Sequence, residues 1–135
     1  MTQNDLVTQD LVLAGWSIVL ALVQLGLAGI GKRMQEPRSW GAGPRDDVMS
    51  YSGRTARLIR AQSNLMETLP MFLGAVAIAH LAGRNGSLSV LGAELYLAGR
   101  VIYVPLYWFG VPYVRTLVWL VATLGLCLVL TDCLS

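Results

Sequence analysis

Four long apolar runs separated by polar connections dominate the chain. They cover about residues 11–30, 55–81, 88–109 and 113–131. An α-helix needs about 20 mainly apolar residues to cross the hydrocarbon core of a bilayer. The pattern therefore predicts an all-α membrane protein, a bundle of four transmembrane helices in a single domain over residues 1–135.

The composition favours the same conclusion. Of the 135 residues, 55% are hydrophobic and only 13% are charged, which is too apolar for a soluble domain of this size. The first apolar run is too long for a signal peptide, and acids rather than bases precede it. We therefore expect this run to be retained as the first helix.

Positive charge gathers at one end of the expected bundle. Seven of the ten Lys and Arg residues lie between the first run and the apolar part of the second, namely Lys32, Arg33, Arg38, Arg45, Arg54, Arg57 and Arg60. Basic loops face the cytoplasm, so we expect loop 31–53 to be cytoplasmic and both termini to be outside. For so compact a chain we expect a bacterial inner membrane. The net charge of +2 favours anionic lipid or a small anionic ligand over nucleic acid.

A polar stripe marks the start of the second span. Its members, 3, 4 and 3 residues apart, are Arg57, Arg60, Asn64 and Glu67. At 3.6 residues per turn they share one narrow face of a helix. A central ionisable side chain costs ~2.5–3.5 kcal/mol on insertion scales and usually needs a buried partner. We therefore expect the function to lie at this stripe.

A second stripe follows on the third span. Its members, 4, 3 and 4 residues apart, are Tyr96, Arg100, Tyr103 and Tyr107. A Glu67–Arg100 ion pair would be a purely structural explanation of the two stripes. It would leave the other arginines unexplained, including Arg115 in the first turn of the fourth span. An excess of inward-facing cations over carboxylates is what an anionic ligand requires.

The two stripes resemble the signature of a known family. Arg60-Ala-Gln-Ser-Asn64-Leu-Met-Glu67 resembles the Arg-Ala-x-x-Asn-x-x-Glu motif of the MAPEG family, the membrane-associated proteins in eicosanoid and glutathione metabolism. A second match runs from Gly99-Arg100 through Tyr103 and Tyr107 to Arg115. The resemblance implies a homotrimer of four-helix protomers with glutathione, as co-substrate, bound between protomers in the cytoplasmic half.

The resemblance also implies the residues of the site. Those expected to bind glutathione are Arg57, Arg60, Asn64, Glu67, Arg100, Tyr103 and Tyr107, with Lys32 or Arg33 meeting a carboxylate from the end of the first helix. Arg115 is similar to the arginine that activates the thiol in the leukotriene C synthase branch. The sequence leaves open whether Arg115 or Tyr103 has the catalytic role. We expect no metal site.

The expected function is that of a glutathione-dependent membrane transferase or peroxidase acting on lipophilic electrophiles. Gln62 and Ser63 stand where the prostaglandin E synthase branch has basic side chains, so we do not expect prostaglandin chemistry. One alternative is a catalytically silent MAPEG-like scaffold that binds glutathione or lipid. The other is a small multidrug transporter, which the absence of a glutamate from the first span disfavours.

Overall fold

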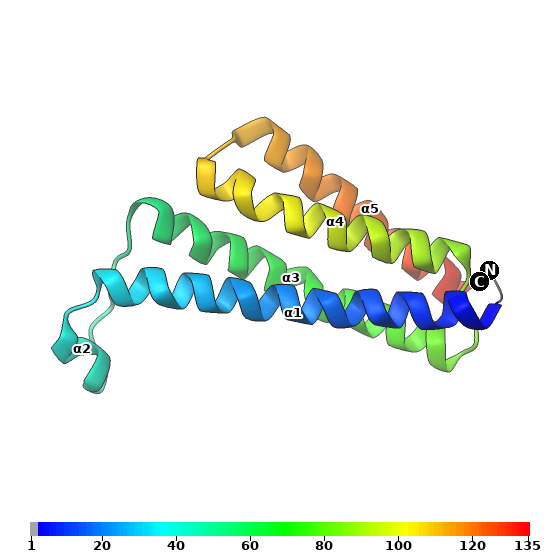
Figure 1. The fold of residues 1–135 in the computed structure, drawn as a ribbon, viewed down its shortest axis with the longest axis horizontal. Helices are drawn as coiled ribbons and strands as arrows, with labels where there is room; N and C mark the ends of the chain where they lie inside the picture. The colour runs from blue at the N-terminus through cyan, green and yellow to red at the C-terminus, as the bar shows by residue number, and fades with distance from the viewer. Residues whose placement is uncertain (1–2) are drawn as a thin grey trace.

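The computed structural model describes residues 3–135, with side chains from residue 9 onward. Five helices make up this part of the chain: α1 (Gln3–Gln35), α2 (Arg38–Ala42), α3 (Gly53–Leu81), α4 (Ser87–Phe109) and α5 (Pro112–Leu134). The four long helices form a bundle, and the short α2 lies at one end of it (Figure 1). The predicted all-α fold with four long apolar helices is confirmed.

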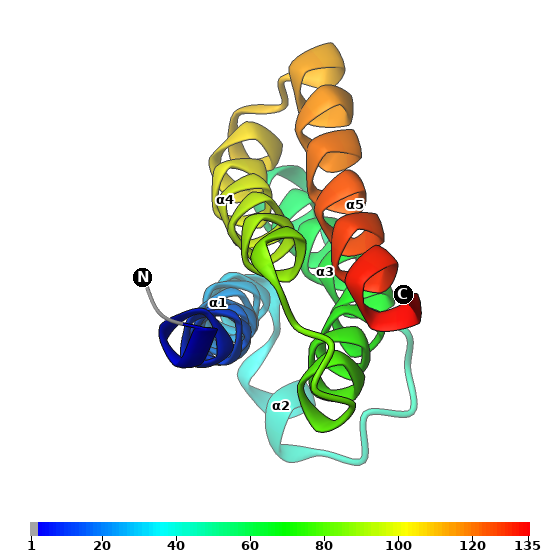
Figure 2. The same cartoon turned by 90° about the vertical axis from the view of Figure 1, so that its right-hand side faces the viewer.

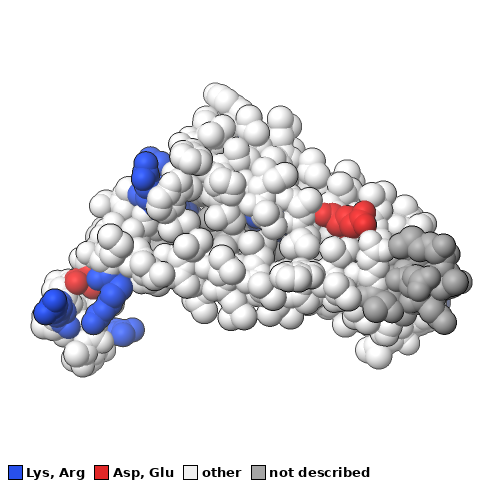
Figure 3. All heavy atoms as spheres, in the orientation of Figure 1, with Lys and Arg blue, Asp and Glu red and all other residues white. Residues whose placement is uncertain are grey.

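Each long helix is long and apolar enough to cross a membrane. The start of α1 and the end of α5 lie at the same end of the bundle, and α2 lies at the other end (Figure 1). Figure 3 shows the Lys and Arg side chains gathered towards the α2 end, while the broad middle of this face is almost free of charge. The chain is an integral, multi-pass membrane protein.

The first helix is longer than the apolar run that predicts it. It continues to Gln35, beyond the expected end at Ile30. The added residues Lys32, Arg33, Met34 and Gln35 are good helix formers, and bases in a last turn interact favourably with the helix dipole. The connection to α3 is therefore shorter than expected, and it contains α2.

A short turn makes α4 and α5 antiparallel neighbours. Gly110 ends α4 in a left-handed conformation with φ 71°, and its N–H donates to the carbonyl of Tyr107. Pro112 then opens α5, where its missing N–H costs nothing because no partner exists for it there. The turn brings the first residues of α5 beside the last residues of α4.

The closest helix crossing joins α4 and α5. A Cβ on Gly92 would collide with the carbonyl oxygen of Gly125, and one on Gly99 would collide with Ala122. Small residues at such crossings let two helix backbones approach each other closely. The apolar core lies beside this crossing, where Phe72 of α3 stacks on Tyr96 of α4 at 4.0 Å between ring centroids. Figure 2 shows α1 and α5 at opposite sides of the bundle.

Two acids join three helices at the end of the bundle that lies away from α2. Asp132 of α5 accepts hydrogen bonds from the N–H groups of Gly86 at 3.0 Å and Ser89 at 2.8 Å, which satisfies donors at the start of α4. Asp10 of α1 is fully buried and accepts a hydrogen bond from the Ser89 hydroxyl at 2.9 Å. The ends of α1, α4 and α5 are thereby joined through Ser89.

Candidate functional site

Arg100 lies where the two polar stripes meet. Its side chain is 1% exposed, and it is the largest fully buried side chain in the described part of the protein. Its Nη1 donates to Asn64 Oδ1 and its Nη2 donates to Thr68 Oγ1, each at 2.6 Å. Both acceptors are neutral, and Nε has no partner. The guanidinium is therefore buried without a carboxylate in hydrogen-bonding contact.

Thr68 connects this charge to the core. Besides accepting from Arg100, its hydroxyl forms a hydrogen bond with the Tyr96 hydroxyl at 3.0 Å. Tyr96 is fully buried and is held by its stacking on Phe72. Sequence reasoning missed Thr68. The available signal was its position four residues after Asn64, which places both side chains on one face of α3.

Glu67 does not form the ion pair with Arg100 that the sequence offered as a structural explanation. Glu67 and Arg60 are exposed, whereas Asn64 is half-buried. At 100° per residue, Arg60 and Glu67 are displaced from Asn64 by about 40–60° in one direction around α3, and Thr68 by about 40° in the other. The α4 helix lies in the direction of Thr68, because the Thr68 hydroxyl contacts Arg100 of α4. Arg60 and Glu67 therefore point away from α4.

Arg57 contacts the C-terminal end of α4 rather than Arg100. Its Nη1 donates to the backbone carbonyl of Trp108 at 3.1 Å, and its guanidinium lies against Gly110. A carbonyl in the last turn of α4 has no partner within its own helix. Arg57 therefore caps α4 and joins the start of α3 to the α4–α5 turn.

Two adjacent tyrosine rings lie between two arginines on the way from Arg100 towards this turn. The Arg100 guanidinium lies 5.5 Å from the ring centroid of Tyr103, which meets Tyr107 edge to face at 5.0 Å. Arg115 of α5 lies 4.5 Å from the centroid of Tyr107. Each guanidinium is attracted to the negative face of its ring. This arrangement brings Arg100, Tyr103, Tyr107 and Arg115 together within one protomer.

Two buried donors at the level of the site lack acceptors. They are Arg100 Nε and Trp119 Nε1. Gly99 packs against Val118 and Ala122, so α4 and α5 cross beside these two donors. Buried donors in proteins are normally hydrogen-bonded. Each of these two donors therefore lacks the partner that a buried donor normally has.

Comparison with known proteins decides the family. The MAPEG family matches residues 13–134, a range that includes every residue of the site described in this subsection. The chain belongs to the MAPEG family. A search of curated proteins finds no match to it.

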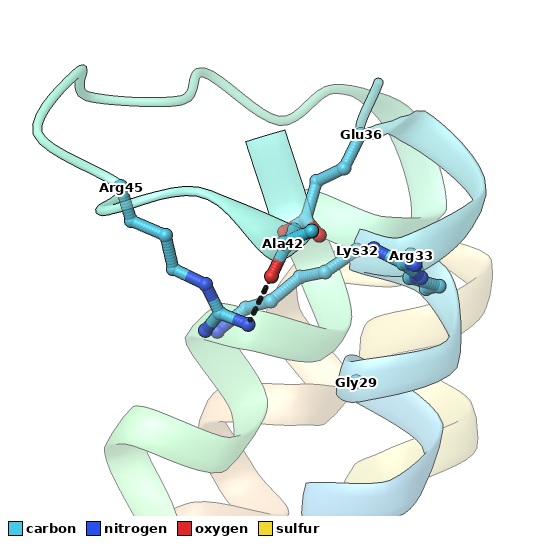
Figure 4. Close-up of a pocket in the computed structure, with 7 residues that line it drawn as sticks. Gly29, Lys32, Arg33, Glu36, Ala42 and Arg45 are labelled. Atoms are coloured by element: carbon cyan, nitrogen blue, oxygen red, sulfur yellow. Dashed lines mark hydrogen bonds between the residues drawn. The ribbon is translucent and has the colours of Figure 1, made fainter. Parts of the chain in front are cut away.

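This MAPEG protein holds Lys32 and Arg33 away from Arg100. Both line a separate pocket of about 430 Å³ between the end of α1 and the α2 loop (Figure 4). Lys32 lies 5.9 Å from the ring centroid of Tyr51, and Arg33 lies against Gly41. Within one protomer these two bases therefore do not join the buried cluster.

An apolar pocket lies beside the stripe on the outer side of the MAPEG bundle. It has a volume of about 390 Å³ and lies between α1 and α3. Its lining includes Leu22, Met66 and Leu69, with Gln62 as a polar member. Met66 adjoins Glu67 in the chain, so this pocket brings apolar surface close to the polar residues of α3.

Proposed function

We propose that this protein is a glutathione-dependent membrane transferase or peroxidase that acts on lipophilic electrophiles. One observation carries the proposal: the buried guanidinium of Arg100 has only the neutral partners Asn64 and Thr68. A buried charge without a counter-charge is costly, and a bound anion removes much of that cost. The MAPEG family typically binds glutathione, which has two carboxylates.

The proposed site uses each residue type for one part of glutathione. Arg60 and Arg100 would bind the carboxylates, because a guanidinium offers paired donors that match a carboxylate. Glu67 would bind the ammonium group. Arg115 would stabilise the thiolate, because an adjacent cation lowers the pKa of a thiol. Tyr103 stays the alternative for this role, since its ring lies between Arg100 and Tyr107.

The chemical step follows from the thiolate. In the transferase reaction its sulfur attacks an electrophilic carbon, a C–S bond forms, and the leaving group departs with the bonding electrons. In the peroxidase reaction two glutathione molecules are oxidised to their disulfide, while the hydroperoxide is reduced to an alcohol and water. The apolar pocket between α1 and α3 supports a substrate that arrives from the bilayer.

The exposed polar residues of α3 support a site shared between protomers. Arg60 and Glu67 are exposed in one chain, and an unsatisfied polar group in hydrocarbon costs several kcal/mol. A neighbouring protomer would cover them and bring its own Arg115, or the bases Lys32 and Arg33 of its first helix, to the same glutathione. We therefore place glutathione between protomers of a homotrimer, in the cytoplasmic half. Arg100 itself lies roughly 14 Å from the end of α4 by helical rise.

Glutathione-dependent conjugation of an aryl halide by the purified protein tests the proposal, with reduction of a lipid hydroperoxide as the peroxidase arm. We expect one of the two activities, and we expect Arg100→Ala and Glu67→Ala to weaken glutathione binding. Arg84→Ala, which removes an exposed base from the α3–α4 connection, is the control and should change neither. Circular dichroism of each variant verifies that it is folded.

Two results would argue against this function. Arg100-dependent glutathione binding without either activity would favour the silent scaffold. If glutathione binding is unchanged in a folded Arg100→Ala protein, Arg100 does not bind a carboxylate of glutathione, and the proposed anion site is wrong.

A further inference from the structure

The pocket at the end of α1 is a second place where bases converge. Its charged lining residues are Lys32, Arg33, Glu36 and Arg45, which are three bases and one acid, a net charge of +2. Lys32 and Arg45 reach into it from opposite walls, one from α1 and the other from the loop after α2 (Figure 4). Like charges on facing walls repel each other, so the pocket is suited to an anion between them.

Arg45 is held in place before any ligand arrives. It has φ 60°, the one positive φ at a non-glycine residue in the described chain. Its Nη2 donates to the Gly41 carbonyl at 3.1 Å, and its guanidinium lies 5.5 Å from the centroid of a Trp40 ring. Left-handed backbone at a long side chain is unfavourable and tends to persist at ligand clamps. Here it directs the guanidinium into the pocket.

The single acid of the pocket is already occupied. Glu36 Oε1 accepts a hydrogen bond from the Tyr51 hydroxyl. This hydrogen bond raises the pKa of Tyr51. Arg33 packs against Gly41 so closely that any Cβ there would collide with its guanidinium. The one carboxylate of the pocket thus bonds a neutral phenol rather than a base. The net charge of +2 remains available to an anion from outside the chain.

Exposed apolar side chains lie close to these bases in the chain. Ile30 and Met34, one turn apart on α1, are 63% and 82% exposed, and Val48 in the loop is 97% exposed. Apolar and basic side chains together at the end of a span are typical of the membrane–water interface. Lys32 lies two residues after the end of the first apolar run, so a bilayer around that run would put the pocket at the level of the lipid headgroups.

We propose that this pocket binds the phosphate group of an anionic phospholipid in the leaflet that surrounds the end of α1. Arg33 and Arg45 would donate hydrogen bonds to the phosphate oxygens, and Lys32 would act as a point charge. The site lies apart from the Arg100 cluster and is independent of glutathione chemistry. It gives Lys32 and Arg33 a ligand other than glutathione.

Lipid retention measured by native mass spectrometry tests the proposal. The protein is reconstituted in phosphatidylcholine nanodiscs with increasing phosphatidylglycerol, and the anionic lipid that stays bound is quantified. We expect Arg45→Gln and Lys32→Gln each to weaken phosphatidylglycerol binding by about tenfold, the scale of losing one charged contact to phosphate. Arg38→Gln removes the same charge from α2 outside the pocket lining, and we expect a smaller loss, because only the general attraction to the anionic surface is weakened.

The same measurement distinguishes a lipid phosphate from a soluble anion as the ligand of the pocket. Inorganic phosphate and glutathione are added in turn to protein in mixed nanodiscs, and neither should displace the bound lipid. Displacement by inorganic phosphate would assign the pocket to a soluble phosphate, and displacement by glutathione would return Lys32 and Arg33 to the glutathione site. Equal losses in Arg45→Gln and Arg38→Gln would show general attraction to the basic end. Each of these three results overturns the lipid site.

Discussion

At the scale of single residues, Thr68 determines how the buried charge of Arg100 is accommodated. Its hydroxyl accepts from Arg100 and also bonds with the hydroxyl of Tyr96. Both partners are fully buried, so neither finds water when the threonine hydroxyl is removed. An unpaired buried polar group costs more than the net gain of an ordinary hydrogen bond.

Thr68→Val keeps the shape of the side chain and removes only this hydroxyl. We expect the free energy of unfolding to fall by about 1–3 kcal/mol, measured by denaturation in mixed micelles. Thr123→Val is the matched control, because the Thr123 hydroxyl bonds only to the Trp119 carbonyl of its own helix, and we expect it to cost less than about 1 kcal/mol. Equal costs for the two variants would contradict the role given to Thr68.

The sequence predicts that the stripes on the second and third spans share a site, and they do meet, through Asn64 and Arg100. It does not predict that Thr68 rather than Glu67 turns towards Arg100. The two positions differ by about 100° around α3, and the direction from which α4 approaches decides between them. A stripe on one helix contains no information about that direction.

At the scale of helices, the apolar runs are enough to predict the four spans, because each must cover a bilayer with uncharged side chains. The ends are less well predicted, as α1 shows by continuing to Gln35. Lys and Arg end an apolar run without ending a helix, since both have good helix propensity. The close crossing of α4 and α5 at Gly92 and Gly125 also escapes prediction, because glycine in a span has several uses.

Gly92→Ala tests this crossing. The added methyl group would collide with the carbonyl oxygen of Gly125, and overpacking of this kind costs about 1–3 kcal/mol of the free energy of unfolding. Gly74→Ala on α3 is the control, because a Cβ there meets nothing within 4 Å. Alanine in a helix is otherwise better than glycine by roughly 0.5–1 kcal/mol, so the control should be neutral or more stable. A Gly92→Ala protein as stable as the control would contradict the close contact between α4 and α5 at this crossing.

At the scale of the whole molecule, charge sets the expected orientation. The bases gather over the end that carries α2, and the start of α1 and the end of α5 lie at the other end (Figure 3, Figure 1). The positive-inside rule then predicts that α2 is in the cytoplasm. Alkaline phosphatase fused after Ser135 should be active, because that enzyme works only outside the cytoplasm. Signal from a reporter that works only in the cytoplasm, fused at the same residue, would reverse the orientation.

The exposed Arg60 and Glu67 lead to a prediction about assembly. We expect the protein to be a homotrimer in mild detergent, because association would cover polar side chains that one bundle leaves exposed. Mass measurement of the protein–detergent complex gives the number of chains. A monomer or dimer alone, in a detergent that preserves the helical content, would contradict a site shared between three protomers.

The most direct test of the proposed function is the ultraviolet absorbance of the glutathione thiolate in the complex at neutral pH. We expect the thiolate band in the unmutated protein and its loss in Arg115→Ala. In that variant, glutathione affinity should stay within a few-fold while turnover falls by ~10²-fold or more, the scale of losing one preorganised charge. A band that persists in Arg115→Ala and disappears in Tyr103→Phe would transfer the activating role to Tyr103. Bound glutathione without any thiolate band in the unmutated protein would contradict the catalytic function.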